Sequence, residues 1–359
     1  MRSLLLSKTV VIGELGLQHR SKSCKQRMFH TSRMLNISHL ISGGIITNYS
    51  CTSRCGHCLY ACSPKREKKY IDKEILIDII HKIRSLGCHS VHIGGGEPFL
   101  NLDGLKMVVK VAHEMKIDIE YVETNSSWYK DMDSAYSILT SLKELGLSTL
   151  LISISPFHNE HIPFYKVKGA IQACRHTGMG VFPWISDFYK EIDAFDSEVP
   201  HEMREYQKKY GFDYFAKIPS RYWIHFGGRA LKTFENVFEK RSHTDILASN
   251  RGGCHELQNV SHFHFDLFHN YIPGLCSGFT IRSDDLGKPI SPDKYPIIST
   301  LFQSGINGFF HMASTEYDFQ PSDGYISKCH LCFDIRRYLV LNRKVSSKEL
   351  GPVAFYENV

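Results

Sequence analysis

Apolar and polar positions alternate along residues 41–235 as short apolar runs followed by longer stretches of helical period. Within those stretches apolar residues recur three and four positions apart, which is typical of amphipathic helices. The predicted strands are Gly44–Asn48, Ser90–Gly94, Ile117–Thr124, Thr149–Ser155, Gly180–Ile185 and Tyr222–Phe226. The predicted helices are Asp72–Leu86, Leu102–Met115, Ser134–Leu145, Tyr165–His176 and Ala194–Tyr210. This alternation predicts an α/β fold, a partial (β/α)6 barrel of the TIM type.

The alternation of strands and helices stops near residue 236. The chain beyond it is rich in Cys, His, Gly and Pro and contains a short aromatic strand, His262–Phe268. We therefore predict four parts: a basic tail or targeting segment (1–40), the partial barrel (41–235), a small cysteine-rich module (236–343) and a C-terminal tail (344–359).

Charge is concentrated at the N-terminus. Residues 1–40 contain seven Lys or Arg and only Glu14, whereas residues 41–359 contain 36 basic and 36 acidic residues. An Arg- and Ser-rich segment poor in acid resembles a mitochondrial transit peptide, although translation from Met34 would also explain it. We expect a cytoplasmic protein, or a mitochondrial-matrix protein if the segment is a transit peptide.

Composition argues against two classes of partner. The longest apolar runs are too short for a membrane span. The balanced charge of residues 41–359 provides no net field that would attract nucleic acid. The eleven cysteines are clustered, which favours metal ligation in a reducing compartment over a disulfide framework.

Three cysteines at spacings of four and three follow the first predicted strand, at Cys51, Cys55 and Cys58. A short loop of this kind can wrap around one corner of an iron–sulfur cubane and leave the fourth iron open to a small molecule. A structural zinc site completed by Cys62 or His57 is the alternative.

A second motif, Gly94-Gly-Gly-Glu97-Pro98, ends the next predicted strand. Glycines allow close backbone approach, and the carbonyls of Gly95 and Gly96 and the Glu97 carboxylate can accept hydrogen bonds from an ammonium group. Together the two motifs resemble the radical S-adenosylmethionine (SAM) superfamily.

That resemblance implies a chemistry and a set of residues. In this family Cys51, Cys55 and Cys58 would hold a [4Fe–4S] cluster whose open iron binds SAM, and reductive cleavage would give a 5′-deoxyadenosyl radical. It further implies that His57 lies by the adenine and that Asn125 and Ser153, after the third and fourth strands, bind SAM. Trp184 and Asp187 lie near the end of the fifth predicted strand and Arg229 follows the sixth, so all three are expected near the cavity mouth.

Four further cysteines form a second set, Cys254, Cys276, Cys329 and Cys332, with Cys276 following a predicted hairpin that ends in a Pro-Gly turn. The outline resembles the SPASM or twitch extensions of some radical SAM enzymes, although the seven-cysteine SPASM pattern is absent. Four thiols can fully ligate an auxiliary [4Fe–4S] cluster or a zinc ion, and the resemblance favours the cluster.

The resemblance predicts a radical SAM oxidoreductase that abstracts hydrogen from its substrate. A peptide or protein substrate is expected, with a small molecule as the alternative and a non-enzymatic zinc protein as the competing class. The expected partners are this substrate and an external electron donor such as flavodoxin or ferredoxin.

Overall fold

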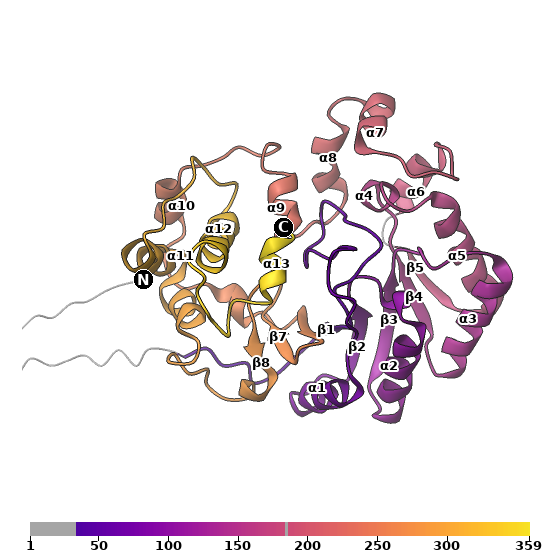
Figure 1. Cartoon of the computed structure of the whole chain (residues 1–359), viewed down its shortest axis with the longest axis horizontal. Helices are drawn as coiled ribbons and strands as arrows, with labels where there is room; N and C mark the ends of the chain where they lie inside the picture. The colour runs from indigo at the N-terminus through magenta and orange to yellow at the C-terminus, as the bar shows by residue number, and fades with distance from the viewer. Residues whose placement is uncertain (1–33, 184–185) are drawn as a thin grey trace, which may run out of the picture. The chain divides into compact units, whose positions relative to one another are not determined.

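A computed structural model describes residues 34–183 and 186–359. Predictions that fall on residues 1–33 and on Trp184 therefore lie outside the described residues. These described residues belong to one compact unit, built on an eight-stranded open sheet in the order β5-β4-β3-β2-β1-β6-β7-β8. The α/β fold with a parallel-rich, unclosed sheet agrees with the predicted partial barrel (Figure 1).

Five successive parallel strands carry the first half of the sheet: β1 (Gly43–Ile46), β2 (Ser90–Gly94), β3 (Asp118–Thr124), β4 (Thr149–Ile152) and β5 (Gly180–Pro183). All of β1 is buried, and β2 is buried apart from its first residue, as expected of parallel strands covered on both faces. The first five predicted strands are confirmed. The bounds of β2 are as predicted, those of β1, β3 and β4 differ at one or both ends, and the predicted end of the fifth strand lies outside the described residues.

Helices α1 (Lys73–Ser85), α2 (Leu102–Glu114), α3 (Met132–Glu144) and α5 (Phe164–Thr177) connect these strands and lie along one side of the sheet (Figure 1). Their ends follow local sequence rules. Asn101 and Asp131 accept hydrogen bonds from backbone N–H groups of the first turns of α2 and α3. Gly178 ends α5 in the left-handed region, which favours glycine. These strand–helix units position the loops that carry the site.

The remaining helical segments of the first half are short. They are η1 (Pro98–Leu100), α4 (Pro156–Asn159), α6 (Ser186–Asp193), α7 (Met203–Tyr210), α8 (Tyr214–Arg221) and α9 (Arg229–Thr233). The predicted helix Ala194–Tyr210 is therefore wrong in its first half, where the chain runs as a loop between α6 and α7.

The predicted strand Tyr222–Phe226 is also wrong, because that segment is an irregular connection between α8 and α9. The sixth parallel strand comes instead from β6 (Phe263–Asp266), which pairs with the opposite edge of β1. Alternating aromatic residues made both segments similar in pattern, and only the pairing with β1 distinguishes them.

Strand β6 and β7 (Asn270–Ile272) form the predicted hairpin, and β8 (Ile281–Arg282) extends it. The cysteine-rich part of the chain thus shares the sheet of the first half through backbone hydrogen bonds. It also contains η2 (His255–Gln258), η3 (Ser283–Asp285), α10 (His243–Ser249), α11 (Pro296–Tyr317), α12 (Lys328–Leu341) and α13 (Val353–Glu357). The division into modules at residues 236 and 344 stays a prediction.

Residues 34–40, placed in the tail by the sequence, belong to the fold. Leu35, Ile37 and Leu40 are buried, and the backbone of this segment pairs with residues near Gly287 and Ile290. Apolar side chains every two or three residues provide this burial.

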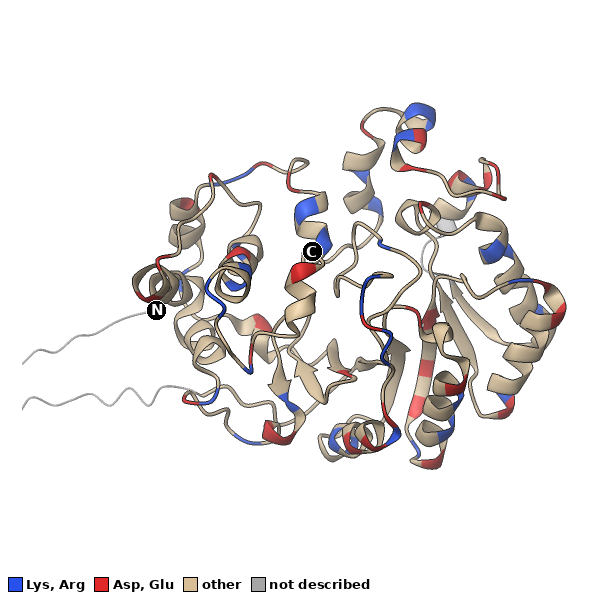
Figure 2. Ribbon diagram, viewed as in Figure 1, with Lys and Arg blue, Asp and Glu red and all other residues tan. Residues whose placement is uncertain are grey.

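Acidic and basic residues occur side by side along the helices that cover the sheet (Figure 2). This mixture agrees with the balanced charge of residues 41–359. In the described part of the chain, no helix is both long enough and apolar enough to cross a membrane.

Candidate active site

The cysteine loop leaves β1 and turns back on itself beside the ends of β2, β3 and β4. Cys51 N–H donates to Ser63 O at 3.2 Å, and Cys58 N–H donates to Cys55 O at 3.2 Å. All three thiols are free and line one cavity of about 250 Å³. The structure thus brings together the three cysteines that the spacing singled out.

The same cavity is lined by most of the other predicted site residues. These are His57, Gly95, Gly96, Asn125 and Ser153. They come from the cysteine loop and from the ends of β2, β3 and β4, as expected where parallel strands present their carboxyl ends. Asp187 is exposed and does not contribute to this cavity.

The glycine turn after β2 packs directly on the chain that leads into the cysteine loop. Gly96 N–H donates to Asn48 O at 2.7 Å, and Glu97 N–H donates to Ser50 O at 3.0 Å. A Cβ atom at Gly96 would lie 1.9 Å from Ser50 O, so no other residue fits without moving the backbone. The two motifs are therefore parts of one structure.

Glu97 is not among the residues that line this cavity. Its side chain is fully buried and accepts hydrogen bonds from Phe99 N–H, Thr124 Oγ1 and Asn125 N–H at 2.8–3.2 Å. Burial raises the pKa of Glu97 to about 7, against these hydrogen bonds, which lower it. The carboxylate therefore positions the end of β3, and its predicted contact with a ligand's ammonium group stays a prediction.

Asn125 is held in place by the Glu97 carboxylate. With its backbone held by Glu97, its side-chain Nδ2 lies 3.5 Å from Cys51 Sγ, 3.1 Å from Thr52 Oγ1 and 3.2 Å from Ser53 Oγ. The amide thus connects β3 to the first turn of the cysteine loop.

His57 lies in an aromatic setting. Its ring centroid is 4.8 Å from that of Phe157, 5.0 Å from His158 and 5.5 Å from Tyr222. Burial, with a contribution from His158, lowers the pKa of His57 well below its usual value, so the ring is neutral. Its buried Nδ1 has no hydrogen-bond partner among the described residues, and this orphaned polar atom fits a site built for a ligand.

The Arg229 side chain holds the cysteine loop through two hydrogen bonds, a role that the sequence did not reveal. Its Nε donates to Cys55 O at 2.9 Å and its Nη2 to Cys62 O at 2.7 Å. Gly228 precedes it at φ 52°, and a Cβ atom there would lie 2.2 Å from Leu59 O. The Gly-Gly-Arg segment is therefore a clamp on the loop.

The thiols differ in acidity. A hydrogen bond with Cys62 lowers the pKa of Cys58 to about 5, and the Arg229 guanidinium acts in the same direction. Burial and the nearby Glu97 raise the pKa of Cys51 to about 12. Because a metal binds thiolates, Cys58 is already in the form that a metal would bind, whereas Cys51 would first have to lose its proton.

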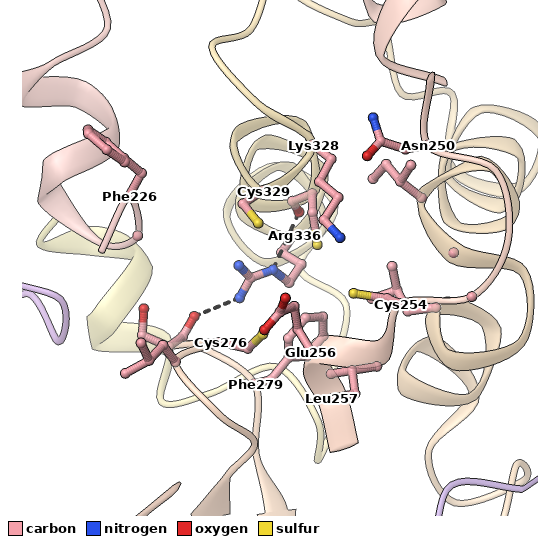
Figure 3. Close-up of a pocket in the computed structure, with 18 of the residues that line it drawn as sticks. Phe226, Asn250, Cys254, Glu256, Leu257, Cys276, Phe279, Lys328, Cys329 and Arg336 are labelled. Atoms are coloured by element: carbon pink, nitrogen blue, oxygen red, sulfur yellow. Dashed lines mark hydrogen bonds between the residues drawn. The ribbon is translucent and has the colours of Figure 1, made fainter. Parts of the chain in front are cut away.

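The second cysteine set lines a separate cavity of about 110 Å³ (Figure 3). Cys254 precedes η2, Cys276 follows the hairpin in a turn where its N–H donates to Pro273 O, and Cys329 and Cys332 lie near the start of α12. The predicted four residues are thus brought together from three distant segments.

Arg336 supplies buried positive charge beside these thiols. Its Nη1 donates to Ser277 O at 2.7 Å, and its guanidinium carbon lies 4.3 Å from the centre of the Phe279 ring. It lowers the pKa of Cys276 and of Cys332, although burial raises both overall. A buried cation next to four thiols suits a ligand set that carries negative charge.

The two cavities share His225 and Leu275 in their walls. Among residues 34–183 and 186–359, no group of three or more His, Cys, Asp or Glu side chains is close enough together to hold a single metal ion. The evidence that either cysteine set could hold a group larger than a single metal ion, such as an iron–sulfur cluster, is therefore of three kinds. The thiols of each set line one cavity, they are free, and charged side chains lie beside them.

Comparison with known proteins agrees with this geometry. Residues 45–181, from β1 to β5, match the family model of the radical SAM superfamily. The matched segment contains both the cysteine loop and the glycine turn. Residues 45–181 form a radical SAM domain.

A GTP 3′,8-cyclase of Limosilactobacillus fermentum is 30% identical over 118 residues, which are 31% of this chain and 33% of the cyclase. The chain thus matches about a third of that relative's length. Similar solved structures include native anSMEcpe with bound AdoMet, at 13% identity and a TM-score of 0.42, covering 84% of this chain and 98% of that one. BtrN in complex with AdoMet and 2-DOIA has 14% identity and a TM-score of 0.38, covering 67% and 75%.

The radical SAM family implies SAM and a [4Fe–4S] cluster as cofactors. The residues present fit both groups. Three free cysteines, a glycine turn of close backbone approach, the Asn125 amide and the orphaned His57 Nδ1 all belong to one cavity.

Proposed function

We propose that this chain reductively cleaves SAM and abstracts a hydrogen atom from a substrate. Cys51, Cys55 and Cys58 would hold the cluster that supplies the electron and leaves one iron open for SAM. The observation that carries the proposal is that these thiols share a cavity with Gly95, Gly96, Asn125 and Ser153.

The chain's own residues would bind and orient SAM. Gly95 and Gly96 provide backbone carbonyls, and Asn125 and Ser153 provide hydrogen-bonding side chains at the strand ends. His57 would contact the adenine through its neutral ring. Glu97 and Arg229 would act through other residues, by holding Asn125 and the cysteine loop in place.

The direct test is SAM cleavage by anaerobically purified, reconstituted protein reduced with dithionite. We expect bound iron and sulfide and the formation of 5′-deoxyadenosine. Cys55→Ala should abolish both the first cluster and the product. The matched control is Cys174→Ala, because Cys174 is a buried thiol in α5 outside both cavities. Zinc without iron or sulfide, or cleavage retained in Cys55→Ala, would refute the proposal.

We further propose that Cys254, Cys276, Cys329 and Cys332 hold an auxiliary [4Fe–4S] cluster, as in SPASM or twitch extensions. This assignment is supported by the shared cavity and by the buried Arg336 beside it. Cys329→Ala should lower the iron content while some cleavage of SAM without substrate turnover persists. A full complement of iron in this variant, with zinc in the second site of the unmodified protein, would contradict the assignment.

The substrate class follows from the resemblance to extended radical SAM enzymes, and we propose a peptide or protein, with a small molecule as the alternative. An external one-electron donor such as flavodoxin or ferredoxin would reduce the first cluster. A peptide pool and a metabolite pool, each screened for substrate-dependent loss of SAM, would separate the two classes.

A further inference from the structure

A hydrogen-bonded chain of three side chains begins at the cavity wall beside the cysteine loop and leads into the sheet. Tyr60, two residues after Cys58, lines the cavity, and its hydroxyl lies 2.7 Å from His264 Nδ1. His264 Nε2 lies 3.0 Å from His92 Nε2. The three residues come from the loop, from β6 and from β2, so the fold itself brings them together.

A glycine makes this arrangement sterically feasible. Strand β1 lies between β2 and β6, and His92 must pass over β1 to reach His264. A Cβ atom at Gly44 in β1 would lie 2.3 Å from His92 Nε2. Only glycine at this position leaves room for the imidazole to cross.

Both imidazoles are neutral in this setting. Burial lowers the pKa of His92 to about 3 and that of His264 well below its usual value. Each ring therefore carries one N–H, and two donor arrangements satisfy the chain. In one of them, His92 donates to His264 and His264 Nδ1–H donates to the phenol oxygen, which leaves the phenolic hydrogen free.

We propose that Tyr60 is a hydrogen-atom donor to carbon-centred radicals formed in this cavity, with His264 as its positioning residue. The inference rests on the proposed SAM cleavage, because the 5′-deoxyadenosyl radical is the radical on which it can be tested. In the step, the phenolic O–H bond breaks homolytically, a C5′–H bond forms, and a neutral phenoxyl radical remains.

The chemistry of the two bonds favours this direction, because a phenolic O–H bond is weaker than a primary alkyl C–H bond. A hydrogen bond donated by His264 Nδ1–H to the phenoxyl oxygen would stabilise the radical without changing the charge of the site. One electron from dithionite and one proton from water would return the phenoxyl to the phenol and reload its exchangeable hydrogen.

The exchangeable hydrogen provides the test. The reconstituted protein is reduced with dithionite in D2O with SAM alone, and the 5′-deoxyadenosine is examined by mass spectrometry for deuterium. We expect one deuterium in a large share of the product, and its loss in Tyr60→Phe. The readout is deuterium per molecule of product, so it does not depend on how much product each variant makes.

Control variants separate Tyr60 from its neighbours. Tyr121 lines the same cavity and stacks on His92 at 5.2 Å, and Tyr121→Phe should keep the deuterium. The thiol of Cys62 carries another exchangeable hydrogen in the cavity, and the 5′-deoxyadenosine made by Cys62→Ser should also contain deuterium. His264→Gln, which retains the phenol, should lower the deuterium content and weaken the phenoxyl signal in electron paramagnetic resonance of samples frozen during turnover.

The outcomes are distinguishable. Undeuterated 5′-deoxyadenosine from the unmodified protein, or deuterium that persists in Tyr60→Phe and disappears in Cys62→Ser, would overturn the role of Tyr60 and leave SAM cleavage standing. The absence of any 5′-deoxyadenosine would overturn the proposed function and this inference together.

Discussion

Replacing Arg229 should loosen the cysteine loop more than any surface substitution of the same kind. Its side chain is only 4% exposed, and it donates to Cys55 O and Cys62 O at 2.9 and 2.7 Å. Hydrogen bonds from a charged donor contribute about 1.5–3 kcal/mol each. Arg229→Ala should therefore lower the free energy of unfolding by roughly 3–5 kcal/mol, which is a large share of an ordinary domain's stability.

The same substitution should affect the proposed cluster. Arg229 contributes to the low pKa of Cys58, so its loss raises that pKa and reduces the thiolate available for ligation. We expect reduced iron at the first site after reconstitution. Arg229→Lys should recover only part of the loss, because an ammonium group cannot reproduce the two fixed directions of the guanidinium.

Urea unfolding monitored by circular dichroism, together with iron analysis, measures both effects. Arg204→Ala is the matched control, since the Arg204 side chain is 79% exposed and pairs with the exposed Glu202. An exposed pair of this kind contributes about 0–1 kcal/mol. If Arg229→Ala were as stable as Arg204→Ala and bound the same amount of iron, Arg229 would not hold the cysteine loop in place.

Three further substitutions test the neighbouring contacts. Gly96→Ala places a Cβ atom 1.9 Å from Ser50 O and should prevent soluble expression. Its control is Gly87→Ala, where the space is open and φ is 85°. That change should cost only about 1–2 kcal/mol for the left-handed backbone. Asn125→Leu should raise the KM for SAM with a smaller change in kcat, and an unchanged KM would remove Asn125 from the proposed site. Ionising buried Glu97, whose pKa is about 7, should reduce stability by about 3 kcal/mol as pH rises from about 4.5 to about 7 and beyond. Glu97→Gln should lose that part of the pH dependence. Unfolding curves of both proteins at acid and alkaline pH measure it, and a difference in the free energy of unfolding that did not change with pH would contradict the prediction.

The sequence predicted those features of the fold that are determined by local patterns of residues. The boundaries of β2 were predicted without error, and the glycine turn and three-cysteine loop lie together as expected because both follow adjacent parallel strands. The error at Tyr222–Phe226 arose because a short run of alternating pattern does not reveal which strand it pairs with. The register of β6 beside β1 depends on contacts between segments far apart in the sequence, which no local pattern contains.

The roles of individual polar groups were harder to predict than their positions. Glu97 stands in the predicted turn, yet the donors that use its carboxylate come from the next strand, at Thr124 and Asn125. The sequence predicted that Arg229 lies near the cavity. It did not predict the hydrogen bonds of Arg229 to backbone carbonyls, because every residue has a carbonyl and the sequence does not show which ones are close. Tyr60 and His264 gave no motif signal at all, because their significance depends on the 2.7 Å contact between them.

The β6–β7 hairpin explains why the two cysteine cavities are neighbours. Strand β6 is fixed to β1, whose end begins the first cysteine loop, and β7 leads into the turn that carries Cys276. Burial raises the pKa of Tyr60, and so do the charges of Glu123, Cys62, Cys58 and Cys276, which places the phenol within electrostatic reach of both cysteine sets. Shifting the hairpin register by one residue would turn His264 to the opposite face of the sheet and break the Tyr60 contact together with the placement of Cys276.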